Sequence, residues 1–112
     1  MRATAVATVV LSLVSPAVAQ DMVSGNYWLD RCKQRHISCL TYVTAMVDMN
    51  DIQPTFGNKR MWCAPQGATV GQALRIISVA MEKQPNQLHR PFYVLATVAL
   101  VHAFPCTPDK QR

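Results

Sequence analysis

CAPQGATVGQALRIISVAMEKQPNQLHRPFYVLATVALVHAFPC, residues 63–106, is the stretch that decides the fold. It begins and ends on a cysteine and predicts two helices joined by a polar turn. Thr69 stands three residues before Gln72, which is the spacing of a capping box at a helix N-terminus. Pro85 cannot continue the backbone ladder of that first helix, and Pro91 suits the first position of a second one.

Both predicted helices are strongly apolar. The first carries a stripe at helical spacing, made of Val70, Ala73, Leu74, Ile77, Ala80 and Met81. The second, from Phe92 to Phe104, is apolar almost throughout. Because a short turn makes two helices antiparallel neighbours, the start of the first should lie beside the end of the second. Among the three pairings that four cysteines permit, this geometry favours Cys63–Cys106.

The N-terminal half predicts two further helices. Ser24 can cap a helix that runs through Cys32. Residues 36–38 indicate a break, after which Ser38 can cap a second helix that frays near Asn50. Residues 53–67 are rich in proline and glycine and predict a loop. No strand and no repeat is indicated, so the fold class is all-α: a small, four-helix, disulfide-stapled single domain.

The remaining two cysteines would form Cys32–Cys39, and this bridge requires the predicted helix break at residues 36–38. An unbroken helix would separate these two sulfurs too far for a bridge. A zinc site is the competing interpretation, because Cys32, His36 and Cys39 on one side and His102 and Cys106 on the other could converge on a metal. Their spacing matches no established zinc motif, so we expect structural disulfides, with no metal and no cofactor.

The N-terminus has the pattern of an export signal. Arg2 precedes an apolar run over residues 3–14, and Ala17-Val18-Ala19 forms an A-x-A cleavage site. We expect a signal peptide over residues 1–19 and one mature domain over residues 20–112. The apolar run is too short to span a bilayer, and no cysteine follows the cleavage site, so no stable membrane anchor is expected. An uncleaved, membrane-anchored N-terminus is the alternative. Export to the periplasm would provide the oxidising compartment that disulfides need.

The distribution of charge and the motifs present limit the classes of function that the sequence supports. The chain carries 11 basic and 6 acidic residues and a net charge of +5, but the charges are scattered and predict no nucleic-acid partner. No acid–base pair, nucleophile motif or phosphate loop appears, so the protein is not expected to be an enzyme. His102 is expected in the core or at its boundary, and His36 in solvent. His89 lies in the polar turn, where it could brace that turn or meet a partner.

Several short motifs resemble those of a known family. They are Cys39-Leu-Thr-Tyr42, Cys63-Ala-Pro65, the segment from Gln84 to His89, and the closing Ala103-Phe-Pro-Cys106. With their spacing over about residues 28–106, the chain resembles the Rap/Tai immunity proteins of type VI secretion systems. The resemblance implies a small exported helical protein that binds and blocks a peptidoglycan amidase effector in the periplasm. It also implies a homodimer, since family members are commonly dimers.

The family tends to present the turn between its last two long helices to the effector's active-site groove. The residues expected to contact the effector here are Glu82, Lys83, Gln84, Asn86, Gln87, Leu88, His89 and Arg90. Leu88 would be the apolar anchor, and polar contacts would come from Lys83, Gln84, Asn86, Gln87 and His89. Two alternatives remain open: an acid-activated periplasmic stress chaperone, and an envelope-associated helical module without a toxin partner. The chain offers only six carboxylates and three histidines to drive an acid switch, which weighs against the chaperone.

Overall fold

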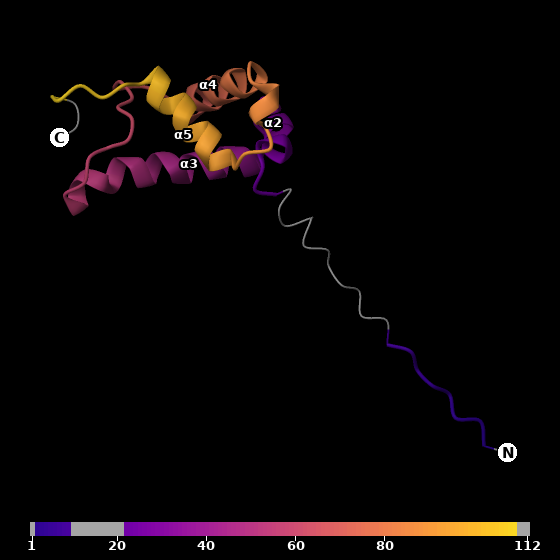
Figure 1. The fold of residues 1–112 in the computed structure, drawn as a ribbon. Helices are drawn as coiled ribbons and strands as arrows, with labels where there is room; N and C mark the ends of the chain where they lie inside the picture. The colour runs from indigo at the N-terminus through magenta and orange to yellow at the C-terminus, as the bar shows by residue number, and fades with distance from the viewer. Residues whose placement is uncertain (1, 10–21, 110–112) are drawn as a thin grey trace.

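The computed structural model describes residues 2–9 and 22–109, and within them it contains four α-helices and no strand. The helices are α2 (Gly25–Lys33), α3 (Ile37–Ile52), α4 (Val70–Glu82) and α5 (Phe92–Ala103), with short 3-10 helices η1 (Gln53–Phe56) and η2 (Pro85–Gln87). Figure 1 shows α4 beside α5, with α3 running beneath them and α2 at the end where α4 turns into α5. The prediction of an all-α, four-helix, disulfide-stapled fold is confirmed.

The structure describes only part of the predicted signal peptide. Residues 2–9 have no regular structure and are exposed, and the predicted cleavage near Ala19 lies outside the described residues. None of the helices in the described ranges is long and apolar enough to cross a membrane.

The break between α2 and α3 ends one helix and begins the next. The Arg35 and His36 N–H groups donate to the carbonyls of Cys32 (3.2 Å) and Arg31 (2.8 Å). This is the Schellman pattern, and it requires Arg35 to take a left-handed φ of 52°. The Cys32–Cys39 disulfide spans the break, with its Cα atoms 5.2 Å apart, so the predicted pairing is confirmed.

The cap of α3 differs from the prediction. The helix begins at Ile37, and the cap is His36, whose Nδ1 accepts a hydrogen bond from the Ser38 N–H at 3.2 Å. The prediction that Ser38 caps this helix was therefore wrong, because the Schellman turn is followed at once by His36 in extended backbone, two residues before Ser38. Pro91 likewise lies at the N-cap of α5 rather than at its first helical position.

The core forms around α4, which contacts each of the other three helices. Its buried apolar face consists of Ala73, Leu74, Ile77 and Met81, which all belong to the predicted stripe. The predicted capping box is present: Thr69 Oγ1 accepts from the Gln72 N–H at 3.1 Å, and Gln72 Oε1 accepts from the Thr69 N–H at 2.9 Å.

An aromatic cluster joins the other helices. The Trp28 ring centroid lies 5.0 Å from that of Tyr42 and 5.5 Å from that of Phe92, and Tyr42 and Phe92 are 4.9 Å apart. These three rings connect α2, α3 and α5, and Phe92 is fully buried. Burial, followed by the nearby Tyr93, raises the pKa of Tyr42 above its ordinary value of about 10.

The long segment between α3 and α4 is held from one buried side chain. Asn50 Nδ2 donates to the Trp62 carbonyl at 2.9 Å, and Asn50 Oδ1 accepts from the Met61 N–H at 2.8 Å. This brings the segment to Cys63, whose N–H donates to the Phe104 carbonyl at 2.8 Å. The Cys63–Cys106 disulfide closes the same end with a Cα separation of 4.9 Å, which confirms the second predicted pair.

Candidate functional site

The predicted contact surface is the turn between α4 and α5. It begins where Lys83 caps α4 and Pro85 stops the helix, and η2 then redirects the chain. Two backbone hydrogen bonds of 3.0 Å tighten the turn, from Gln87 N–H to the Gln84 carbonyl and from Arg90 N–H to the Gln87 carbonyl. The turn is thus a short, ordered connection rather than an open loop.

The N-terminus of α2 braces this turn through the backbone. Helix α2 begins with N–H groups that have no partner inside the helix. The Gly25 N–H donates to the Arg90 carbonyl and the Asn26 N–H to the Leu88 carbonyl, both at 2.9 Å, and the Phe92 N–H returns to the Val23 carbonyl at 2.7 Å. Three main-chain bonds therefore fix the far side of the turn to another part of the chain.

Gly25 makes room for this close approach. A Cβ atom at residue 25 would lie 2.5 Å from Leu95 Cδ1 and 3.1 Å from the Leu88 carbonyl oxygen. The glycine is buried, so a side chain here would require the Leu95 side chain to move and the Leu88 carbonyl to shift slightly. No pattern in the sequence predicts this contact.

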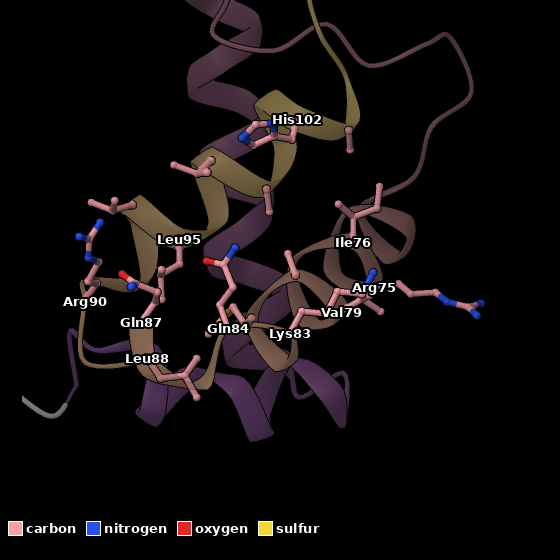
Figure 2. A pocket seen from close by; sticks show the side chains of 16 residues that line it. Arg75, Ile76, Val79, Lys83, Gln84, Gln87, Leu88, Arg90, Leu95 and His102 are labelled. Carbon is pink, nitrogen blue, oxygen red and sulfur yellow. The ribbon is translucent and has the colours of Figure 1, made fainter.

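A groove of about 760 Å³ opens beside the turn, between α4 and α5. Helix α4 lines it with Ile76, Val79 and Ala80, and α5 lines it with Val94, Leu95, Val98 and Ala99. Val79 is 43% exposed and Val98 is 52% exposed, so the groove presents apolar side chains to solvent. Figure 2 shows the groove with the turn at one end and His102 at the other.

Charge around the groove has one sign. Arg75, Lys83 and Arg90 all belong to its lining, and none of the described residues that line it is acidic. The acidic residue nearest in sequence is Glu82, whose Oε1 pairs with Lys33 Nζ at 3.5 Å, and Glu82 does not line the groove. The groove is therefore an apolar floor with a cationic border.

The predicted contact residues divide into two groups. Lys83, Gln84, Gln87, Leu88 and Arg90 line the groove, whereas Glu82, Asn86 and His89 lie outside its lining. Leu88 is partly buried and packs against the core, so only part of its side chain is available to a partner. The exposed His89 is free of the core.

Other lining residues were not predicted. His102 was expected in the core or at its boundary; it is exposed and lines the groove, because α5 turns only one face toward α4. Arg75 and Val98 were also missed. The sequence held a signal for them: a helix that is apolar all round in so small a protein cannot bury every face, so some apolar positions of residues 92–103 must be exposed.

The four cysteines have no free thiol, since both pairs are disulfides. The alternative zinc site would need these thiols as ligands, and in the described part of the chain no group of three His, Cys, Asp or Glu side chains is placed to hold a metal ion. The groove and the braced turn are features that suit binding.

These features define a small, disulfide-stapled helical protein with a rigid turn and an adjoining apolar groove. The family model described as Rap1a immunity proteins matches residues 24–106, which is most of the chain, and the protein belongs to this family. Membership carries an effector-immunity role, and immunity proteins act by binding and are generally not enzymes. Neither the curated proteins nor the solved structures contain a match to this chain.

Proposed function

We propose that this protein is a periplasmic immunity protein that binds and occludes a peptidoglycan amidase effector of a type VI secretion system. The observation that carries the proposal is the family match over residues 24–106, which includes both disulfides and the whole α4–α5 hairpin. The two disulfides fit an oxidising compartment, and the leader-like residues 1–19 would direct the chain there.

Occlusion is the mechanism that the turn supports. A segment that blocks a catalytic cleft loses affinity if it must first become ordered. Here the three main-chain bonds from residues 23–26 and the two bonds within the turn order it in advance. The Cys63–Cys106 disulfide fixes the other end of the same hairpin. The turn can therefore enter a cleft as a preformed surface.

The side chains of the turn would supply the contacts. Several backbone groups of the turn already make hydrogen bonds within the chain, whereas the side chains of Lys83, Gln84, Asn86 and His89 are exposed. Their polar ends can pair with groups inside an amidase cleft, and the exposed part of Leu88 would add an apolar contact.

Inhibition assays test the proposal. The oxidised protein is titrated against a panel of peptidoglycan amidases of the effector type, with release of peptidoglycan fragments as the activity and calorimetry for affinity. We expect at least one amidase to be inhibited at a one-to-one ratio. Gln84→Arg should weaken that inhibition tenfold or more because it adds bulk at the contact surface. Gln66→Arg is the matched control, as Gln66 is also exposed but precedes α4 at the opposite end of the hairpin.

Two outcomes would count against the proposal. If the wild-type protein inhibits none of the amidases, the target class is wrong. If inhibition occurs but Gln84→Arg and Gln66→Arg weaken it equally, the turn is not the contact surface. Circular dichroism of both variants checks that the helices are intact.

A further inference from the structure

The described residues leave the groove between α4 and α5 open along the surface. Its volume of about 760 Å³ lies in the range of sites that receive a ligand or a partner segment. Val79 and Val98 stay exposed along it, on facing sides. An amphipathic helix commonly binds such a groove by placing its apolar stripe on the floor.

The charged residues at the border of the groove favour a partner with negative charge. Arg75 lies on the α4 side and Arg90 beside the start of α5, with Lys83 at the turn between them (Figure 2). Among the described residues, no acidic side chain lines the groove beside these cations, and Glu82 pairs with Lys33 instead. A partner that places carboxylates on both sides of an apolar stripe would match this border.

A second copy of this chain fits the groove poorly. In a two-fold symmetric dimer centred on the groove, each copy would present the same patch to the other. Arg75, Lys83 and Arg90 would then face the same three cations, and like charges placed together oppose association. A single anionic lipid also fits poorly, because the cations are spread around the groove rather than gathered at one headgroup.

We propose that the α4–α5 groove receives an acidic amphipathic segment of the partner protein, with its apolar stripe between Val79 and Val98 and its carboxylates against Arg75, Lys83 and Arg90. The inference rests on the proposed function in taking the amidase effector as that partner. It assigns the effector a second contact: the turn enters the catalytic cleft while the groove holds a segment beside it.

A designed peptide tests the groove without an effector. The probe is a helical peptide of about 15 residues, long enough to cover α5, with leucines on one face and glutamates flanking them. Its companion carries lysine at every glutamate position. Amide chemical shifts of the oxidised full chain report binding. We expect the acidic peptide to shift residues of the groove and to bind at least tenfold more tightly than the lysine peptide at low salt.

Charge reversal gives the control. Arg75→Glu with Arg90→Glu should reverse the preference, so that the lysine peptide binds better. If these arginines had only a structural role, the double substitution would not make the lysine peptide bind better than the acidic one. Lys59→Glu, an exposed loop residue outside the groove, should leave the preference unchanged. Val98→Asp should abolish peptide binding, and Met49→Asp, also exposed and apolar, should not.

The other outcomes show which of the two proposals is wrong. The inference is overturned if the acidic peptide does not bind, if shifts appear elsewhere, or if sedimentation shows a dimer that Val98→Asp dissociates. If an amidase is inhibited equally by wild type and Val98→Asp, the groove inference fails while the proposed function stands. If the acidic peptide binds the groove but no amidase is inhibited, the proposed function fails and the groove assignment remains.

Discussion

Replacing Asn50 by alanine is expected to destabilise the protein by about 3 kcal/mol. The Asn50 side chain is 5% exposed and makes two good hydrogen bonds, to the Trp62 carbonyl at 2.9 Å and the Met61 N–H at 2.8 Å. A third contact, from the Trp62 N–H, is long at 3.4 Å and adds little. Each lost bond that leaves a buried backbone group unpaired costs about 1–3 kcal/mol. About 2 kcal/mol for the buried Trp62 carbonyl and about 1 kcal/mol for the partly buried Met61 N–H give the expected value.

Urea unfolding of the oxidised protein measures this loss. With a slope of about 1.5 kcal/mol per molar urea, a loss of about 3 kcal/mol lowers the midpoint by about 2 M. Asn58→Ala is the matched control, because its amide donates to Gln53 Oε1 at 3.1 Å on the exposed surface. That change should cost less than about 0.5 kcal/mol. If both alanine variants unfold at the same urea concentration, Asn50 does not organise the segment between α3 and α4.

Four further changes test other parts of the structure. Thr69→Ala removes the capping box and should cost about 1 kcal/mol in urea unfolding. Arg35→Gly relieves the strain of a φ of 52°, while the greater freedom of glycine in the unfolded chain offsets part of that gain. The free energy of unfolding should rise by about 0.5 kcal/mol. A lower free energy of unfolding would show that the arginine side chain matters more than its backbone conformation. Gly25→Ala should cost about 1–3 kcal/mol by overpacking the α2 contact with the turn, seen as a lower Tm. Burial, followed by Tyr93, raises the pKa of Tyr42 above its ordinary value of about 10. The stability that this shift contributes is therefore fully present below about pH 10 and is lost as pH rises through the folded pKa, so Tyr42→Phe should flatten the fall in Tm above about pH 10.

Local signals made much of the fold predictable. Thr69 and Gln72 stand at the spacing of the capping box that the structure contains, and both disulfides follow from where the helices end. These features depend on residues close in sequence or on one short turn. The position of the candidate turn, after Pro85, was predictable for the same reason.

Long-range contacts were not predictable in the same way. Asn50 lies 11 residues from Met61, and nothing in its neighbourhood marks it as buried. The bond between the Gly25 N–H and the Arg90 carbonyl joins segments 65 residues apart, and a main-chain bond leaves no side-chain pattern to detect. The exposed position of His102 depends on which face of an evenly apolar helix turns toward α4. In each case the answer depends on packing between helices, which periodicity alone does not give.

The hydrogen bonds between the turn and residues 23–26 affect how easily the protein could come to bind a different partner. The bonds that hold the turn to residues 23–26 join main chain to main chain, so they do not depend on which side chains the turn carries. Exchanging Lys83, Gln84 or His89 would alter what the surface recognises while leaving its shape in place. A library randomised at these exposed positions should therefore retain most of its members as folded proteins. A protein of this design can acquire a new target without first having to recover its stability.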